Sequence, residues 1–311
     1  MYFKYGNIHL SEKEYKNTIR YDNVDYLVAP LNEQNKGSKG GNSNVFKLLN
    51  PQTEDEYVIK FSKYNISKPN NPVNIISRIT RFAREVEALK YTTDLNSENI
   101  NFKSDNIIQY YFDDYKDIGA GRFHYYVMEK ADFDLTQYLD KNDISDQQRL
   151  LLCTDILNGI KQLHCNDIYH RDIKPDNILF VKKTWKIGDL GLIANRNSEF
   201  EIKEVGEKIG PIGWLSPEAT NKYLNEGEGK VNKYGFDCSI DSFSDVFQLG
   251  KLFWYIFQGN IPLGQIERED FKLADTEIYE IIYEMLKHSK NRPTIEEIEE
   301  GFKSRYSYYG L

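Results

Sequence analysis

The sequence predicts an α+β protein in which a small antiparallel β-sheet carrying one helix precedes a larger, mainly helical part. Between residues 21 and 62, the apolar runs DYLVAP, VFKLL and YVIKFS alternate with turn-rich segments, which predicts three strands joined by two loops. Two further strands are expected in NIIQYYF and FHYYVMEK. One helix is predicted before them from apolar side chains at helical spacing: Ile75, Ile79, Phe82, Val86 and Leu89.

Past Ala131 the pattern becomes helical. Ser145 and Gln148 have the spacing of a capping box, in which each side chain bonds the other residue's backbone N–H at the start of a helix. Thr294 and Glu297 repeat this spacing and open the last long helix. Both helices are therefore expected to begin at these residues.

The charge balance bounds the possible partners. The chain has 311 residues, with 40 Lys and Arg against 48 Asp and Glu, so its formal net charge is −8. This balance argues against a protein whose main task is to neutralise nucleic-acid or anionic-lipid phosphates, and we expect no nucleic-acid partner. The three cysteines form no CxxC pair, which indicates a reducing compartment without structural zinc.

The sequence contains no predicted membrane span. The most hydrophobic stretch, residues 246–257, is too short to cross a bilayer and is interrupted by Gln248, Gly250 and Lys251. It predicts a buried central helix. The N-terminal residues also lack the basic start and apolar run of a secretory signal. We expect a cytoplasmic protein without membrane insertion, with delivery into a host cell by a route that needs no cleaved signal as the alternative.

Two motifs carry the functional signal: HRDIKPDN at residues 170–177 and GDLG at residues 188–191. With YVIK upstream and SPE and NRPT downstream, they resemble the protein kinase family over residues 27–302. Single motifs of this kind are common, but their order and spacing together are specific.

The resemblance implies a bilobal protein-kinase fold of the α+β class. The small antiparallel sheet and its helix would form an N-lobe at residues 27–130, and the mainly helical C-lobe would occupy residues 131–311. Residues 1–26 are expected to form an extension packed on or near the N-lobe.

Phosphoryl transfer needs metal ions that neutralise the triphosphate, a cation on its oxygens and a carboxylate that orients the attacking hydroxyl. By the resemblance, Asp172 is the catalytic base and Lys174 contacts the γ-phosphate. Asn177 and Asp189 are the implied metal ligands. Their oxygen donors suit Mg²⁺, with Mn²⁺ as the alternative, and ATP is the implied cofactor.

In the N-lobe, the resemblance makes Lys60 of YVIK the ligand of the α- and β-phosphates and Glu85 its ion-pair partner. The family's glycine-rich phosphate loop is divergent here, because only Gly40 stands at one of its three glycine positions ahead of Val45. A Cβ hinders close approach of the backbone to phosphate, so we expect a looser loop and weaker ATP binding.

The stretch YYVMEKADFDL resembles the hinge between the lobes. The resemblance makes Met128 the gatekeeper beside the adenine. Glu129 and Ala131 would offer backbone groups to the adenine edge, and Asp134 would lie near the ribose.

Three more residues are implied to be architectural. Glu218 and Arg292 resemble the buried ion pair that anchors the activation segment. Asp245 resembles the carboxylate that starts the central helix and holds the backbone of the catalytic loop. Their loss is expected to look like misfolding more than lost chemistry.

The activation segment, residues 189–218, contains neither Thr nor Tyr, and its only hydroxyls are Ser198 and Ser216. We hypothesise that Glu207, paired with Arg171, orders this segment without phosphorylation, since a carboxylate partly substitutes for phosphate. A solvated acidic face is the alternative.

The implied function is transfer of the ATP γ-phosphate to Ser or Thr hydroxyls of a protein substrate. Lys174 within KPDN is typical of Ser/Thr kinases, whereas Pro211 with Trp214 is typical of Tyr kinases. Lys174 would contact the transferred phosphate itself, so we favour Ser/Thr, with a dual-specificity or Tyr kinase as the alternative.

Two other functions compete with this one. A nucleotide-binding pseudokinase scaffold would be expected to lack part of the catalytic set, which is intact here. A small-molecule kinase would generally lack KPDN together with SPE. We expect a monomer, with a transient dimer for autophosphorylation as the alternative.

Overall fold

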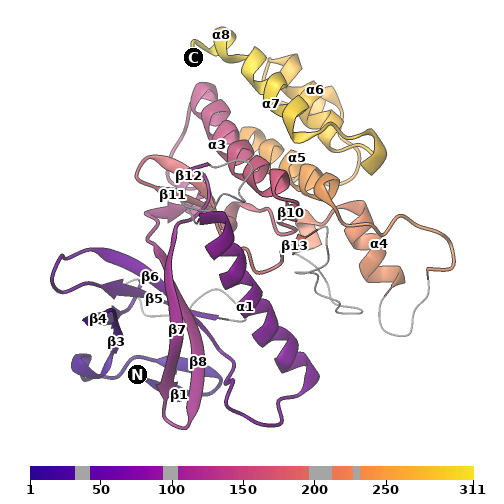
Figure 1. Ribbon diagram of the computed structural model, residues 1–311. Helices are drawn as coiled ribbons and strands as arrows, with labels where there is room; N and C mark the ends of the chain where they lie inside the picture. Colours follow the sequence, from indigo (N-terminus) through magenta and orange to yellow (C-terminus); the bar gives the residue numbers. More distant parts are fainter. Residues whose placement is uncertain (32–42, 94–103, 196–211, 227–231) are drawn as a thin grey trace. The chain divides into compact units, whose positions relative to one another are not determined.

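The computed structural model describes residues 1–31, 43–93, 104–195, 212–226 and 232–311. The chain divides into two compact units, one comprising Met1–Asp94 and Ile108–Ala131 and the other Leu95–Ile107 and Asp132–Leu311. The first unit contains an antiparallel sheet and one long helix, whereas the second is mainly helical (Figure 1). The predicted α+β fold class is confirmed.

The first unit is built on a six-stranded antiparallel sheet in the order β3-β4-β5-β6-β8-β7. Its strands in chain order are β3 (Thr18–Tyr21), β4 (Val24–Ala29), β5 (Ser43–Leu49), β6 (Glu56–Ser62), β7 (Tyr110–Ile118) and β8 (Gly121–Glu129). The helix α1 (Val73–Thr93) contacts β7. A hairpin of β1 (Tyr2–Lys4) and β2 (Asn7–His9) and the 3-10 helix η1 (Glu14–Lys16) precede the sheet.

One strand begins later than the sequence predicted. NIIQYYF was expected to be extended from residue 106, but β7 begins at Tyr110. Asn106 instead accepts a hydrogen bond from the backbone N–H of Ile187 at 2.8 Å, and its side-chain amide donates to the carbonyl of Trp185 at 2.8 Å. These bonds tie the start of the segment to the second unit and leave it outside the sheet.

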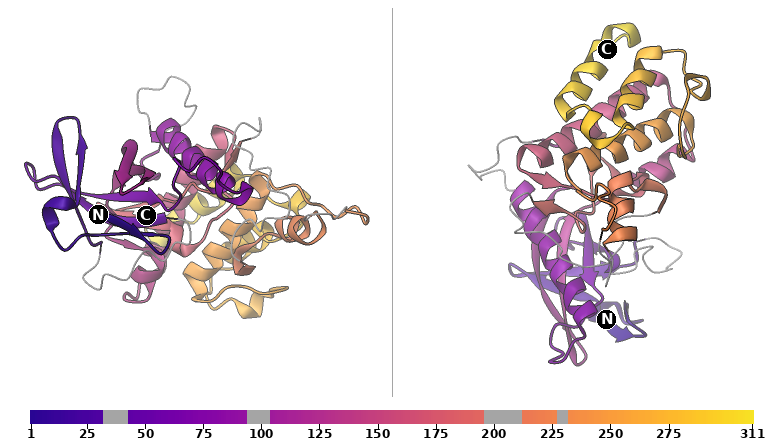
Figure 2. Two further views of the ribbon diagram at one scale, coloured as in Figure 1. Left: turned by 90° about the horizontal axis from the view of Figure 1, so that it is seen from below. Right: turned by 90° about the vertical axis from the view of Figure 1, so that its right-hand side faces the viewer.

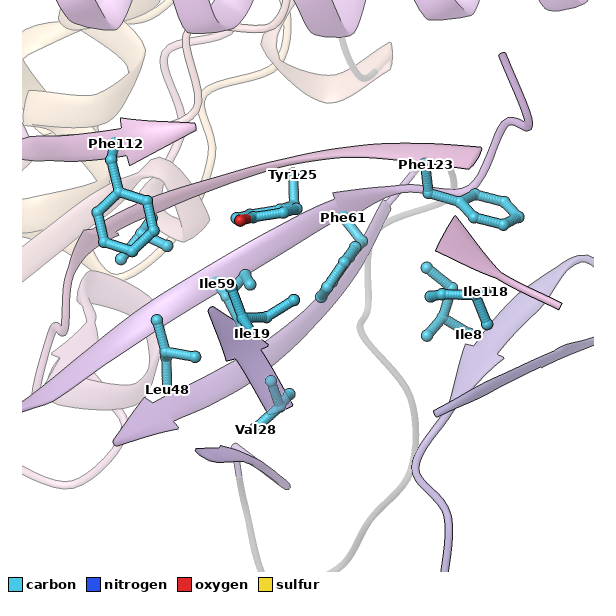
Figure 3. Close-up of a cluster of buried hydrophobic side chains, with 11 residues drawn as sticks. Ile8, Ile19, Val28, Leu48, Ile59, Phe61, Phe112, Ile118, Phe123 and Tyr125 are labelled. Atoms are coloured by element: carbon cyan, nitrogen blue, oxygen red, sulfur yellow. The ribbon is translucent and has the colours of Figure 1, made fainter. Parts of the chain in front are cut away.

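The core of the first unit includes side chains from the N-terminal residues. Ile8 and Ile19 belong to the same buried cluster as Phe61 and Tyr125 from the central strands (Figure 3). The side-chain oxygen of Asn44 on β5 also accepts from the backbone N–H of Ile8 at 3.0 Å. Ile8 and Ile19 are therefore part of the sheet's hydrophobic core.

The second unit is dominated by helices. They are α2 (Leu135–Leu139), α3 (Asp146–Cys165), α4 (Pro217–Asn225), α5 (Ser242–Gln258), α6 (Thr276–Met285), α7 (Ile295–Ser304) and α8 (Tyr306–Tyr309), with 3-10 turns η2 (Pro175–Asn177), η3 (Ile212–Trp214), η4 (Arg268–Asp270) and η5 (Ser289–Asn291). The helices α3, α5, α6 and α7 pack together: α3 contacts α5 and α7, and α6 also contacts α5 and α7. They lie together in both views of Figure 2, coloured from pink to yellow.

The second unit also contains short strands that pair with one another. β9 (Phe133–Asp134), β11 (Ile178–Val181) and β12 (Thr184–Ile187) form a three-stranded sheet. β10 (Ile168–Tyr169) pairs with β13 (Ala194–Asn195).

Helix starts follow the local sequence closely. Both predicted capping boxes are present, with Ser145 and Thr294 as the N-cap residues of α3 and α7. Asp245 lies in the first turn of the central helix α5, as expected, and Asp241 is the N-cap residue of that helix. Asp241 accepts from the backbone N–H of Phe243 at 2.9 Å, which leaves Asp245 for other bonds. None of the described helices has the length and apolar character needed to cross a lipid bilayer.

Candidate active site

The catalytic loop of the second unit presents a carboxylate with two different oxygens. Asp172 is buried, and its Oδ2 accepts from Lys174 Nζ at 2.7 Å and from Asn177 Nδ2 at 2.9 Å. Asn177 Nδ2 also donates to the backbone carbonyl of Asp172 at 2.8 Å. Among the described residues, no group hydrogen-bonds the other oxygen, Oδ1. Asp172 is thus held by one oxygen, while the second remains available as an acceptor.

Burial also sets the acidity of this carboxylate. It raises the pKa of Asp172 above the ordinary value; the neighbouring ammonium of Lys174 opposes this effect, and the negative charge of Asp189 adds to it. Lys174 therefore limits the rise in pKa and helps to keep Asp172 ionised.

The two predicted metal ligands lie on adjoining stretches of chain. The backbone N–H of Gly188 donates to the carbonyl of Asn177 at 2.8 Å, which brings Asp189 beside this loop. Asn177 uses its amide nitrogen on Asp172, so its amide oxygen is the atom that it could offer to a cation. A carboxylate and an amide oxygen suit a hard divalent cation, and these residues therefore fit Mg²⁺ or Mn²⁺.

The backbone of this region is strained at two positions. Arg171 has φ 65° and Asp189 has φ 55°, in the left-handed region that side chains with a Cβ rarely adopt. The fully buried Asp245 accepts from the backbone N–H groups of His170 at 2.7 Å and Arg171 at 2.8 Å, and from His164 Nε2 at 3.0 Å. These bonds stabilise the unusual conformation on one side of Asp172.

In the first unit, Lys60 on β6 and Glu85 on α1 form an ion pair, with Lys60 Nζ 2.7 Å from Glu85 Oε1. Their side chains are 12% and 3% exposed, respectively. The buried hydroxyl of Tyr126 on β8 donates to the same Oε1 at 2.8 Å. Val45 faces Lys60 across the β5–β6 ladder. Sequence reasoning missed Tyr126, although it lies two residues before the predicted gatekeeper.

The predicted hinge residues differ in what they can offer. Met128 pairs with Val58 at the end of β8. The backbone N–H of Glu129 already donates to the carbonyl of Gln109 at 2.9 Å, so this N–H is not available to an adenine. Ala131 ends the first unit. Asp134, in the second unit, caps α2 by accepting from the backbone N–H of Gln137 at 2.8 Å.

Four residues that the sequence analysis singled out lie outside the described residues. They are Gly40 of the phosphate loop and Ser198, Glu207 and Pro211 of the activation segment. The proposed pairing of Glu207 with Arg171 therefore stays a hypothesis.

The architectural pair is a two-point ion pair. Arg292 Nη1 lies 2.6 Å from Glu218 Oε1 and Nη2 lies 3.1 Å from Oε2, with both side chains buried. The hydroxyl of Ser244, which the sequence did not single out, donates to Oε1 at 2.8 Å. Burial alone would raise the pKa of Glu218, but Arg292 outweighs it and holds that pKa below the ordinary value.

The proteins to which this chain is similar are protein kinases. A family model described as "Protein kinase domain" matches residues 32–305. The membrane-associated tyrosine- and threonine-specific cdc2-inhibitory kinase wee-1.1 of Caenorhabditis elegans is 36% identical over 127 residues, which cover 40% of this chain and 24% of that protein. The dual specificity protein kinase TTK of Mus musculus is 25% identical over 75% of this chain and 25% of that protein.

A bacterial protein is similar to this chain as well. The probable serine/threonine-protein kinase PknB of Lactococcus lactis is 28% identical over 72% of this chain and 31% of that protein. The aligned regions thus span between 24% and 31% of the length of these three relatives. The family model, in contrast, extends over most of the chain and includes both units. This chain belongs to the protein kinase domain family.

Proposed function

We propose that this chain is an ATP- and magnesium-dependent protein kinase that transfers the γ-phosphoryl group to Ser or Thr hydroxyls of a protein substrate. The observation that carries this proposal is the arrangement at Asp172, where Lys174 and Asn177 hold one carboxylate oxygen and the other has no hydrogen-bond partner among the described residues. A base that must accept a proton from a substrate hydroxyl needs such an oxygen.

The roles of the other groups follow from their charge. In the transfer, the acceptor hydroxyl would donate to Asp172 Oδ1, which orients its oxygen toward the phosphorus. Lys174 would neutralise charge on the transferring group, and Lys60, held by Glu85, would bind phosphate oxygens. A metal ion held by Asn177 and Asp189 would neutralise the triphosphate when bound.

The Ser/Thr preference is part of the proposal. It is supported by Lys174, whose ammonium hydrogen-bonds the catalytic carboxylate, and by the relative named as a probable serine/threonine-protein kinase. A dual-specificity kinase is the second candidate, because another relative carries that name. We further propose a cytoplasmic monomer that pairs transiently for autophosphorylation.

Labelled ATP tests this proposal directly. The purified chain, incubated with γ-labelled ATP, Mg²⁺ and a mixed protein substrate, is expected to label Ser and Thr, while Asp172→Asn does not. Phosphotyrosine as the main product would overturn the Ser/Thr preference, and equal labelling by both proteins would overturn the catalytic assignment.

Tyr126→Phe is expected to weaken ATP binding with little effect on folding. The change removes one hydrogen bond to the Glu85 carboxylate, so Glu85 and with it Lys60 become less well held. A hydrogen bond to a charged group contributes about 1.5–3 kcal/mol, and about 1.4 kcal/mol is a tenfold change, so we expect the KM for ATP to rise by about 10-fold, with about 150-fold as the upper bound.

Tyr125→Phe is the matched control for this measurement. Tyr125 is the neighbouring residue of the same strand, but its ring lies in the hydrophobic cluster of the sheet and contacts Phe61. It is expected to leave the KM for ATP unchanged. The same rise in both variants would show that Tyr126 acts through general packing and not through Glu85.

A further inference from the structure

The central helix α5 carries a row of buried polar side chains. Asp245, Gln248 and Lys251 are spaced three residues apart. Their relative solvent exposures are 0%, 3% and 9%. Residues at this spacing are neighbours on one side of a helix. Burial of a polar group costs free energy unless the group is hydrogen-bonded, so the partners of these side chains indicate why they are there.

Gln248 holds the peptide groups on both sides of the catalytic aspartate. Its Oε1 accepts from the backbone N–H of Ile173 at 2.9 Å, and its Nε2 donates to the carbonyl of Arg171 at 3.1 Å. Arg171 has the left-handed backbone conformation, which is costly for a residue with a Cβ. A single amide therefore fixes the backbone on both sides of Asp172, one helical turn beyond Asp245.

Lys251 reaches a different segment. Its Nζ donates to the carbonyl of Gly213 at 2.9 Å and lies 5.5 Å from the ring centre of Phe247. Gly213 lies between Pro211 and Trp214, the two residues that resemble those of Tyr kinases and therefore bear on the choice of acceptor hydroxyl. We call residues 212–219 the acceptor segment.

The Lys251 ammonium is poorly compensated for a buried charge. Within the described part of the chain, Lys251 forms no ion pair with a carboxylate, and burial lowers the pKa of its ammonium group. A buried cation without a counter-ion costs stability. Lys251 therefore does not serve stability alone, and its bond to the acceptor segment suggests a functional role.

We propose that Gln248 and Lys251 are positioning residues that set two functional segments from one helix. Gln248 fixes the catalytic carboxylate for any acceptor, and Lys251 fixes the acceptor segment for a protein acceptor. The inference rests on the proposed kinase function and adds a division of labour to it. Gln248 is expected to affect transfer to any acceptor, whereas Lys251 is expected to affect transfer to a protein only. Reactions with two different acceptors can therefore test the two roles separately.

Water provides the second acceptor. In ATP hydrolysis the bond from the γ-phosphorus to the β,γ-bridging oxygen breaks and ADP leaves with its electron pair, while a bond to the water oxygen forms. One proton of the water passes to Asp172 and then to solvent, and the other stays on the inorganic phosphate. This reaction needs Asp172 but not the acceptor segment. Peptide phosphorylation needs both.

The experiment compares Gln248→Met, Lys251→Met and the control Gln258→Met. Gln258 is also a buried glutamine on α5, but it accepts from the backbone N–H of Lys272 at the far end of the helix. For each protein the kcat and KM for a peptide substrate, the KM for ATP, the rate of ATP hydrolysis in water and the Tm are measured.

Gln248→Met is expected to lower the kcat for peptide phosphorylation and the rate of hydrolysis together by about 10²-fold, as for a misplacement of about 1 Å, with the KM for ATP unchanged. Lys251→Met is expected to raise the KM for the peptide about 10-fold, with hydrolysis unchanged and the Tm the same or higher. Gln258→Met is expected to leave both reactions unchanged.

Three results would overturn the inference. They are unchanged peptide kinetics in both test variants, a parallel loss of both reactions in Lys251→Met, and losses in Gln248→Met that Gln258→Met shares. A wild-type chain that neither hydrolyses ATP nor labels protein would instead overturn the proposed function.

Two conservative variants keep the test decisive if a Met variant does not fold. Lys251→Arg retains a cationic donor and is expected to keep the wild-type KM for the peptide. Gln248→Glu retains the shape but places an oxygen against the carbonyl of Arg171, and it is expected to lower both reactions. If Lys251→Arg raised the KM for the peptide and lowered the rate of ATP hydrolysis by the same factor, the assignment would be contradicted.

Discussion

Asp172→Asn is expected to lower the turnover of phosphate transfer by about 10²–10⁴-fold, the usual contribution of a general base. The substitution keeps the volume of the side chain, so folding is expected to persist. It removes the negative charge that binds Lys174 and replaces the oxygen that would accept the substrate's proton. Affinity for ATP is expected to change much less, because Lys60 and Glu85 lie in the other unit. Steady-state kinetics and calorimetric titration with ATP measure the two quantities separately.

Asp176→Asn is the matched control in the same loop. Asp176 lies in η2, is exposed, and accepts from the hydroxyl of Thr136 at 3.1 Å. We expect its turnover to stay within about twofold of the wild type, as is usual for a substitution away from buried features. If Asp172→Asn and Asp176→Asn lose turnover to the same extent, the loss belongs to the loop in general and not to the carboxylate of Asp172.

Local rules made the second unit more predictable than the first. A capping box is encoded by two residues three apart, so Ser145 and Thr294 identify the starts of α3 and α7 without tertiary information. The strands of the N-terminal residues are three or four residues long, and β1 is exposed throughout, so they carry little periodic signal. Their burial of Ile8 and Ile19 depends on contacts with the sheet, which the sequence does not display.

The candidate site shows the same division. Asp172, Lys174, Asn177 and Asp189 could be named because they stand in fixed motifs. Tyr126 and Gln248 could not, because their roles arise from partners 41 and 75 or more residues away. A signal was nevertheless present on α5, where Gln248 and Lys251 interrupt an otherwise apolar run. Polar residues inside a predicted buried helix are therefore worth treating as candidate positioning residues.

Arg292→Met is expected to reduce the free energy of unfolding by about 3–5 kcal/mol, because it leaves the Glu218 carboxylate buried without its counter-ion. Arg292 also donates from Nε to the carbonyl of Lys287 and from Nη1 to the carbonyl of Phe243, both at 2.7 Å. Urea unfolding measures the loss. Lys303→Met is the control, because the Lys303 side chain is 54% exposed and its partner Glu299 keeps a second cation, Lys161, so the loss is expected to be about 0–1 kcal/mol.

The pH dependence separates the ion pair from the other bonds of Arg292. In the wild type the pKa of Glu218 lies below its ordinary value of 4.5, so the pair's contribution is complete above that value and is lost as the pH falls through the folded-state pKa. In Arg292→Met, burial without the partner is expected to raise that pKa, so the variant gains stability as the pH falls. The difference in unfolding free energy is therefore expected to be largest near neutral pH and to shrink in acid. A difference that stays constant with pH would assign the loss to the bonds with Lys287 and Phe243.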